Sequence, residues 1–371
     1  MTAGGATDTD RRFMAAAIRL SRKHLGLTGT NPSVGTLIVR DDGSGPVIIG
    51  RGVTAIGGRP HAEAEALTEA GERARGAAAY VTLEPCAHHG RTPPCANALV
   101  AAGVKRVVGA ATDPDDRVSG KGYAILRAAG IEVVESMLAA QAANQMAGYL
   151  TRSLKKRPEV TLKLAISADG MIGRLGEGQV AITGPIARGQ VHLMRAESDA
   201  ILVGVNTAIA DDPELTVRLP GLAKRSPIRI VLDPNARLPV ESKLAESARQ
   251  TPVWLAACSD ANETARAALE KAGVRILAAE LFDGRLALPE LLDDLAGQGV
   301  STVLVEGGAE TARAFLADDL VDRIVLFRGP GPVGEGGIPA PISAESIPDG
   351  FRLVRETRFG DDECKEWARP L

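Results

Sequence analysis

Three metal-ligand side chains, far apart along the chain, place the strongest constraint on how it can fold. His61 is followed by Cys86 and Cys95, and each cysteine comes directly after a proline. One imidazole and two thiolates can hold a zinc ion only if the fold brings all three to within a few ångströms of one point. The first half of the chain must therefore bend two separate segments around a single site.

A carboxylate two residues after His61 indicates that this metal site is catalytic. His61 and Glu63 fall in the first turn of a helix expected over 61–74, so one can bind metal while the other faces a bound water. Catalytic zinc sites use three protein ligands and keep the fourth position open, and a glutamate outside the ligand set is typical of zinc deaminases. A closed structural site, with His88 or His89 as the fourth ligand, stays open as an alternative.

Composition narrows the class of protein. A chain of 371 residues with 45% hydrophobic and 24% charged residues is long enough for two globular domains. A net charge of −3 and only 3% aromatic residues do not favour nucleic-acid binding. Four cysteines make no disulfide framework, and no apolar stretch of roughly 18 residues predicts a membrane span. We expect a cytoplasmic protein, with Cys258 buried in an apolar run and Cys364 without a partner.

The order of strands and helices predicts two α/β domains with a boundary between about 150 and 160, where a basic run ends in Pro158. In the first half, strands are expected over 34–39, 46–53, 78–83, 104–109 and 131–134, and helices over 10–25, 61–74, 96–103 and 120–130. In the second half, strands are expected over 160–167, 200–203, 228–232, 252–257, 274–277, 302–306 and 323–327, and a helix over 185–197. Asp10 is the expected N-cap of the first helix, and residues 1–9 are expected to be disordered.

The second half carries weaker chemical signals. It has no Gly-x-Gly-x-x-Gly after a strand, so a Rossmann fingerprint is absent. Over 303–311 an apolar strand runs into glycines and then a helix, an arrangement that can offer backbone N–H groups to a phosphate. An ordinary tight turn is the alternative. The segment Gly329–Gly337 is rich in glycine and proline, and it either closes over a ligand or is simply mobile.

The residues of the first half resemble the deaminase half of the bifunctional riboflavin biosynthesis deaminase/reductases. The segment Glu84–Cys95 carries most of this resemblance, because eight residues separate its two cysteines where other zinc deaminases have two. Further matches are Asn31–Gly35, His61–Glu63, Asp113-Pro114 and Gly120–Gly122. The resemblance covers about residues 10 to 150.

This resemblance implies roles for particular residues. Zinc would be held by His61, Cys86 and Cys95, with Glu63 as the proton shuttle and Asn31 as a contact to the pyrimidine edge. His88, Arg91 and Thr92 would either frame the substrate or only shape the loop. Lys121 is a candidate for the ribose phosphate, with a solvated surface lysine as the alternative.

The second half resembles the dihydrofolate-reductase-like half of the same family. The matching segments are Lys163–Gly170, Arg195–Ile201, Gly204–Thr207, Asp211–Arg218 and Glu306–Gly308. Residue by residue, the resemblance implies NADPH contacts at Ala165, Thr207, Asp211, Gly308, Ala309, Glu310 and Thr311. It implies substrate contacts at Lys163, Arg195, Leu215, Arg218 and Glu306. The segment Gly176–Thr183 departs from the family, since it lacks a serine and a tryptophan and is one residue longer, which leaves its contacts open.

The resemblance therefore implies a fold and a function for the whole chain. Residues 1–155 would form a cytidine-deaminase-like, zinc-dependent pyrimidine deaminase domain, and residues 156–371 a dihydrofolate-reductase-like, NADPH-dependent reductase domain. Zinc-activated hydroxide would deaminate 2,5-diamino-6-(5-phosphoribosylamino)pyrimidin-4-one, and NADPH would then reduce the ribosyl side chain to ribityl. A homo-oligomer is expected, with neither nucleic acid nor membrane as a partner.

Two other functions stay open at this point. One is a single-activity nucleoside or tRNA deaminase with a non-catalytic C-terminal half. The other is a non-enzymatic protein stabilised by zinc. In that case Glu63 would have no chemical role, so its replacement by glutamine would leave the function intact.

Overall fold

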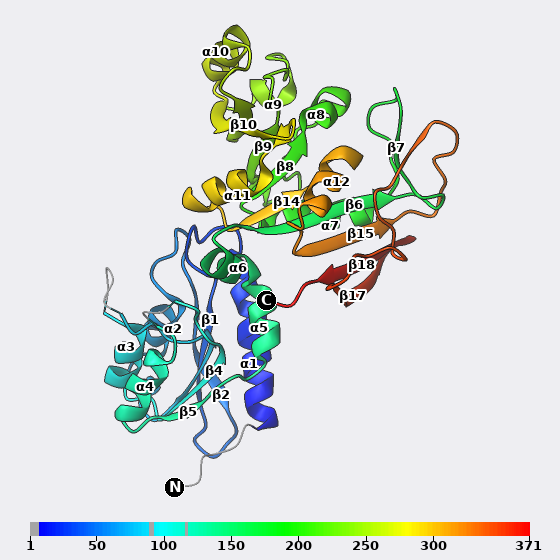
Figure 1. The fold of residues 1–371 in the computed structure, drawn as a ribbon. Coiled ribbons are helices and arrows are strands. Elements are labelled where there is room, and N and C mark those ends of the chain that lie inside the picture. The colour runs from blue at the N-terminus through cyan, green and yellow to red at the C-terminus, as the bar shows by residue number, and fades with distance from the viewer. Residues whose placement is uncertain (1–6, 89–92, 116–117) are drawn as a thin grey trace. The chain divides into compact units, whose positions relative to one another are not determined.

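The computed structural model describes residues 7–88, 93–115 and 118–371 of the chain. The chain divides into two compact units (Figure 1). The N-terminal unit ends at Lys156, and the C-terminal unit spans Arg157–Pro370. No helix in the described part of the chain is both long and apolar enough to cross a membrane.

The N-terminal unit is built on a five-stranded sheet with the order β2-β1-β3-β4-β5. Its strands are β1 (Gly35–Arg40), β2 (Val47–Val53), β3 (Ala78–Leu83), β4 (Arg106–Ala111) and β5 (Glu132–Val134). β1 pairs antiparallel with both β2 and β3, whereas β3, β4 and β5 are parallel. The carboxyl ends of the parallel strands therefore meet at one edge of the sheet.

Helices pack on both sides of this sheet. They are α1 (Asp8–Ser21), α2 (Ala62–Ala70), α3 (Cys95–Ala102), α4 (Lys121–Ala128), α5 (Ala139–Gln145) and α6 (Ala147–Lys155), with 3₁₀ turns at Arg22–His24 and Gly71–Ala74. α1 packs on β1 and β3 and touches α5, whereas α2 packs on β2 and β1 and touches α3. Figure 1 shows the sheet lying between these two groups of helices.

Glycines in the strands allow the helix backbones to come unusually close. A Cβ atom on Gly52 would lie 1.9 Å from the carbonyl oxygen of Ala62, and one on Gly50 would lie 2.2 Å from that of Ala66. On the other side of the sheet, a Cβ on Gly35 would lie 2.2 Å from the carbonyl oxygen of Ala17. The start of α2, which carries His61 and Glu63, is thus set directly against β2.

The C-terminal unit is built on a nine-stranded sheet with the order β11-β10-β9-β8-β14-β6-β15-β18-β17. Its strands are β6 (Glu159–Ile166), β8 (Ala200–Gly204), β9 (Ile228–Leu232), β10 (Val253–Cys258), β11 (Arg275–Ala279), β14 (Thr302–Val305), β15 (Arg323–Arg328), β17 (Arg352–Phe359) and β18 (Asp362–Ala368). The strands from β11 to β15 in this order are parallel, and β18 and β17 continue the sheet antiparallel.

Helices and two small ribbons complete this unit. The helices are α7 (Pro185–Glu197), α8 (Val205–Asp211), α9 (Lys243–Glu246), α10 (Glu263–Ala272), α11 (Leu288–Gly297) and α12 (Ala309–Ala317), with a 3₁₀ turn at Ala223–Arg225. The ribbons pair β7 (Met171–Arg174) with β16 (Gly337–Pro339), and β12 (Leu281–Phe282) with β13 (Arg285–Leu286).

Each unit has its own hydrophobic core. In the C-terminal unit, alternate residues of one strand belong to different clusters: Ile230 packs in one and Val231 in another. This is expected of parallel strands covered on both faces, whose residues are mostly apolar. Cys258 and Cys364 are both buried, and none of the four cysteines is in a disulfide.

The strands expected from the sequence are confirmed, two of them, 78–83 and 228–232, with the same bounds. The start of the first helix is a correction, because Thr7 is its N-cap and accepts a hydrogen bond from the backbone of Asp10. The carboxylate of Asp10 in turn accepts a hydrogen bond from the backbone N–H of Thr7, which completes a capping box. The helix begins at Asp8, so the expectation of disorder over residues 1–9 is wrong for residues 8 and 9.

Replacing Gly52 by alanine tests the close approach of α2 to β2. The added methyl group would force helix and strand apart, and overpacking of this kind costs about 1–3 kcal/mol. We expect the free energy of unfolding, measured with chaotrope, to fall by about that amount. Gly189, in α7, has open space around its Cβ position, so Gly189→Ala is the control and should lose no stability. Equal stability of Gly52→Ala and the unmodified protein would contradict the packing described.

Candidate functional sites

The side chains of His61, Cys86 and Cys95 meet in the N-terminal unit, and their ligand atoms all lie within 4.8 Å of one another. The Nδ1 atom of His61 lies 3.7 Å from the Sγ of Cys86 and 3.4 Å from the Sγ of Cys95. Tetrahedral zinc with ordinary Zn–N and Zn–S bonds separates its ligand atoms by about 3.5–3.8 Å. Both the donor types and their spacing therefore fit a zinc ion.

Two helix starts and one strand end position these ligands. His61 is the N-cap of α2, with extended backbone, and Cys95 is the first residue of α3. Cys86 follows β3 closely, and its Sγ accepts a hydrogen bond of 3.2 Å from the backbone N–H of Cys95. Free N–H groups at helix starts favour negative charge, so this geometry stabilises thiolate.

The two thiols influence each other strongly. A hydrogen bond from the Cys95 thiol lowers the pKa of Cys86 to about 4, against the effect of burial and with help from His61. The same hydrogen bond to Cys86, together with burial, raises the pKa of Cys95. Two thiolates this close repel each other, since the charge on Cys86 also raises the pKa of Cys95. A divalent cation between them would compensate both charges.

Glu63 lies beside the ligands without belonging to the cluster. Its side chain is buried, and its carboxyl group interacts with Cys95. Burial, and secondly the negative charge on Cys86, raise the pKa of Glu63 to about 7. A carboxyl group in this position can accept and release a proton near neutral pH.

The other expected contacts of the N-terminal unit are only partly described. Asn31 lies against Gly58, since a Cβ atom on Gly58 would fall 2.3 Å from its Nδ2. His88 is half-buried and is not part of the ligand cluster found among the described residues. His89, Arg91 and Thr92 lie outside the described residues. Lys121 is exposed at the start of α4.

In the C-terminal unit, the expected cofactor residues gather at the carboxyl ends of β8 and β14, which are adjacent and parallel. The N–H of Gly308 donates a hydrogen bond of 3.2 Å to the Oγ1 of Thr207. Cβ atoms on Gly204 and Gly307 would each lie 2.6 Å from atoms of Thr311. Glycine therefore lets Thr207, Gly308 and Thr311 meet around a helix start, which is a suitable place for a phosphate.

The remaining expected cofactor residues lie on the elements around this point. Ala165 is on β6, next to β14, and Asp211 is the last residue of α8, where burial raises its pKa. Ala309 and Glu310 open α12, and the Glu310 carboxylate accepts a 3.0 Å hydrogen bond from Asn206.

Three of the expected substrate residues form a buried charge cluster. The carboxylate of Glu306 accepts hydrogen bonds of 2.7 and 3.0 Å from Arg195, and the Nζ of Lys163 lies 3.8 Å away from it. Burial alone would raise the pKa of Glu306, but Arg195 and Lys163 hold it below its usual range. Burial lowers the pKa of Lys163. Two cations face one anion, so the cluster keeps a surplus positive charge that suits a phosphorylated substrate.

The loop after α8 carries Leu215 and Arg218. Arg195 donates a 3.1 Å hydrogen bond to the carbonyl of Thr216, which ties this loop to the charge cluster. Leu215 is buried in the core at a positive φ of 54°, so a ligand can reach its backbone more readily than its side chain. Arg218 is exposed and pairs with Glu214 at 2.9 Å.

His192 lies near the charge cluster, but the sequence did not lead us to predict it as a site residue. Its Nδ1 accepts a 3.4 Å hydrogen bond from the backbone of Arg218. Burial, then Arg195 and Arg218, lower its pKa. The available signal was its spacing, because His192 and Arg195 lie one turn apart on α7 and share a face.

The segments Gly176–Thr183 and Gly329–Gly337, whose roles the sequence left open, both contact neighbouring parts of the C-terminal unit. Within Gly176–Thr183, a Cβ atom on Gly178 would lie 3.3 Å from the carbonyl oxygen of Ala210, so the segment runs beside α8. The segment Gly329–Gly337 is held by Asp169, whose carboxylate accepts hydrogen bonds from the N–H groups of Val333 and Gly334. With the hydroxyl of Ser167, these bonds lower the pKa of Asp169 to about 2. Closure over a ligand and simple mobility both stay predictions for this glycine-rich segment.

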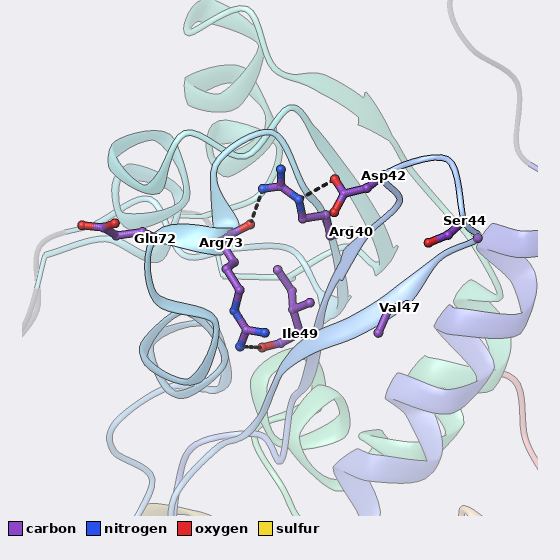
Figure 2. Close-up of a pocket in the computed structure, with 8 residues that line it drawn as sticks. Arg40, Asp42, Ser44, Val47, Ile49, Glu72 and Arg73 are labelled. Atoms are coloured by element: carbon purple, nitrogen blue, oxygen red, sulfur yellow. Dashed lines mark hydrogen bonds and ion pairs between the residues drawn. The ribbon is translucent and has the colours of Figure 1, made fainter.

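A surface pocket of about 560 Å³ opens elsewhere on the N-terminal unit (Figure 2). It is lined by Arg40, Asp42, Ser44, Gly45, Val47, Ile49, Glu72 and Arg73. Its arginines are already engaged: Arg40 pairs with Asp42 at 2.7 Å, and Arg73 donates to the carbonyl of Ile49. None of the residues expected to bind metal, cofactor or substrate is among these lining residues, so we assign no function to it.

Both units match family models. Residues 7–111 match the cytidine and deoxycytidylate deaminase zinc-binding region, and residues 158–365 match the RibD C-terminal domain. Riboflavin biosynthesis protein RibD of Aquifex aeolicus is 38% identical over 96% of this chain and 97% of its own length. The RibD protein of Escherichia coli is also 38% identical, over 96% of this chain and 98% of its own length.

Solved structures match over the same extent. Acinetobacter baumannii RibD is 38% identical with a TM-score of 0.81, covering 97% of this chain and 99% of its own. A Thermotoga maritima diaminohydroxyphosphoribosylaminopyrimidine deaminase/5-amino-6-(5-phosphoribosylamino)uracil reductase is 32% identical with a TM-score of 0.84, at the same coverage. These matches confirm the α/β architecture of both units expected from the sequence.

Metal analysis tests the ligand set. We expect one zinc ion per chain in the purified protein, and its loss on Cys95→Ser, because a serine hydroxyl is a poor zinc ligand. Cys258→Ser changes a buried cysteine of the other unit and should keep the metal. Retention of zinc by Cys95→Ser would show that the ion is bound elsewhere.

Proposed function

The chain belongs to the RibD family of riboflavin biosynthesis proteins, and on that premise we propose which of its residues carry each of two reactions. It is a bifunctional enzyme, a zinc-dependent deaminase and an NADPH-dependent reductase. The alternative of a single-activity deaminase is not favoured, because family models match both halves of the chain. The observation that most supports our assignment is that several expected residues meet in each unit: His61 with both cysteines, Thr207 with Gly308, and Arg195 with Glu306.

For the deaminase, we assign the metal to His61, Cys86 and Cys95 and the proton transfers to Glu63. Zinc, when bound, supplies the activation of water. Glu63 would take a proton from the attacking water and deliver it to the departing nitrogen. The ring carbon thereby gains a C–O bond, loses its C–N bond and releases ammonia. The buried position of Glu63 beside Cys95 supports this role. Asn31 would hold the edge of the pyrimidine.

For the reductase, we assign the cofactor to Ala165, Thr207, Asp211 and the turn Gly308–Thr311. NADPH supplies the hydride, which reduces the ribosyl side chain to ribityl. The helix start at Gly308, with Thr207 beside it, would receive a phosphate of the cofactor.

Lys163, Arg195, Leu215, Arg218 and Glu306 would hold the phosphorylated substrate. The surplus positive charge of the buried cluster supports this assignment. Glu306 would keep the two cations of that cluster in place, so that a phosphoribosyl group meets a fixed arrangement of donors.

We also propose how the assignments extend to the whole molecule. Residues 1–155 form the deaminase domain and residues 156–371 the reductase domain, and the division of the chain one residue further on, after Lys156, supports this boundary. The protein acts in the cytoplasm as a homo-oligomer, without nucleic acid or membrane as partner. Its four cysteines, none in a disulfide, support a reducing compartment.

Glu63→Gln tests the proton-transfer role. With the diaminopyrimidine ribosyl phosphate as substrate, ammonia release should fall by about 10²-fold or more, because glutamine cannot carry the proton. Zinc content should not change, and neither should NADPH oxidation with the deaminated substrate. Glu65→Gln alters an exposed carboxylate on the same helix and serves as the control. Undiminished ammonia release by Glu63→Gln would reject the assignment.

Gly58→Ala tests the role of Asn31. Gly57 and Gly58 both have a positive φ, 80° and 87°, so alanine strains the backbone at either position. Only at Gly58 does the new methyl group meet Asn31, since Gly57 has nothing within 4 Å. We expect the deaminase KM to rise by about tenfold in Gly58→Ala and to change by less than about twofold in Gly57→Ala. Equal KM values in the two variants would argue against a substrate contact at Asn31.

A further inference from the structure

Arg229 is the largest fully buried side chain in the described part of the chain, and it is a cation. It lies on β9, with 0% of its surface exposed, in line with Ile201 of β8 and Val253 of β10. Burial lowers its pKa to about 10, so it stays charged at neutral pH. Burying a charge costs free energy unless other groups pair with it, so the groups that contact Arg229 indicate what it does.

The guanidinium of Arg229 bridges two segments that are far apart along the chain. Its Nη1 donates a 3.1 Å hydrogen bond to the carbonyl of Glu214 and a 2.8 Å bond to the hydroxyl of Ser247. Its Nη2 donates to the carbonyls of Ser247 and Thr251. These acceptors are backbone and hydroxyl oxygens, so the cation is held by dipoles and in turn fixes the backbone at Glu214.

The loop fixed in this way is strained. Asp212 and Leu215 have positive φ angles of 38° and 54°, a conformation that residues other than glycine rarely adopt. Such a backbone persists only where its surroundings hold it from several sides. Besides Arg229, the loop is held by Arg195 at the carbonyl of Thr216 and by the hydroxyl of Ser226 at the N–H of Val217.

This loop carries residues of both proposed binding sites. Asp211 stands at its start, and Leu215 and Arg218 lie further along it. Its shape therefore governs how cofactor and substrate are held. An apolar side chain on β9 would fill the same space, but it would leave the carbonyl of Glu214 without a donor.

We propose that Arg229 is a positioning residue of the reductase: it holds the loop Asp211–Arg218 in its strained form by bridging Glu214 to the segment Ser247–Thr251. The inference rests on the proposed roles of Asp211, Leu215 and Arg218. Arg229 itself touches neither reactant. Because the loop binds groups distant from the reacting carbon, its distortion weakens binding more than it slows hydride transfer.

Kinetics of the full-length enzyme test the proposal, with the deaminase as an internal control. In Arg229→Met, the KM of NADPH oxidation for the deaminated phosphoribosyl substrate should rise by about tenfold or more, with kcat within about threefold. In Arg229→Lys the rise should be smaller, because an ammonium can still donate to some of the oxygens. Ammonia release should be unchanged in both. Ser247→Ala removes one acceptor but keeps the bond to Glu214, so its KM should stay within about twofold of the unmodified enzyme.

Three results would overturn the proposal. An unchanged KM in Arg229→Lys and Arg229→Met is the first. The second is a loss of kcat that matches the loss of folded protein in a melting curve, with KM unaltered, since that marks a purely structural residue. The third is an equal rise in KM for Ser247→Ala. If Arg229→Met does not fold, Arg229→Lys decides the question.

Hydrogen exchange in the free protein separates this proposal from the assignment of ligands. Amides of residues 212 and 214–218 should exchange faster in Arg229→Lys than in the unmodified protein, whereas amides of β3 should not change. Faster exchange with unaltered KM would retain the anchoring role but reject the proposed ligand contacts of the loop. Unaltered exchange would reject the anchor itself. Failure of the unmodified protein to oxidise NADPH would concern the proposed reductase site alone.

Discussion

In both units, the proposed site lies where a helix begins shortly after a parallel strand has ended. In the N-terminal unit, β3 leads to Cys86, whose thiolate accepts the N–H of Cys95 at the start of α3. In the C-terminal unit, β14 runs into Gly307 and Gly308, and α12 begins directly after them. The first N–H groups of a helix have no partner inside it, so both places favour negative charge. One backbone arrangement thus suits a metal-bound thiolate in one unit and a cofactor phosphate in the other.

The C-terminal unit buries more charge than stability alone would favour. Glu306 is enclosed with Arg195 and Lys163, and Arg229 is held by carbonyl and hydroxyl oxygens. Apolar side chains of similar volume are often at least as stabilising as buried ion pairs. A positioning role explains these buried charges better. Each of them holds a neighbouring group in place, which a flexible or apolar side chain could not do. Stability and binding therefore make different demands on the same residues.

Features that depend on local chemistry could be predicted from the sequence, whereas those that depend on distant partners could not. Strands rich in β-branched residues, such as Ile228–Leu232, were placed correctly, and the meeting of His61, Cys86 and Cys95 could be expected from residue type and order. The strand Arg352–Phe359 was missed because it is charged and largely exposed, and its pairing is decided by its neighbour in the sheet. The burial of Arg229 could not be predicted either, because the oxygens that accept its hydrogen bonds lie in segments before and after it in the sequence. His192 shows only a helical spacing, and its partner Arg218 comes from another segment.

The two separate hydrophobic cores have a consequence for the cell. Each unit buries its own apolar residues, and one polypeptide joins them near Lys156. Translation of a single message therefore produces the catalysts of two consecutive steps in equal number. Whatever the level of expression, the capacity to form the deaminated intermediate and the capacity to consume it rise and fall together. A change in gene dosage alters the flux through the two steps but not the ratio of the two catalysts.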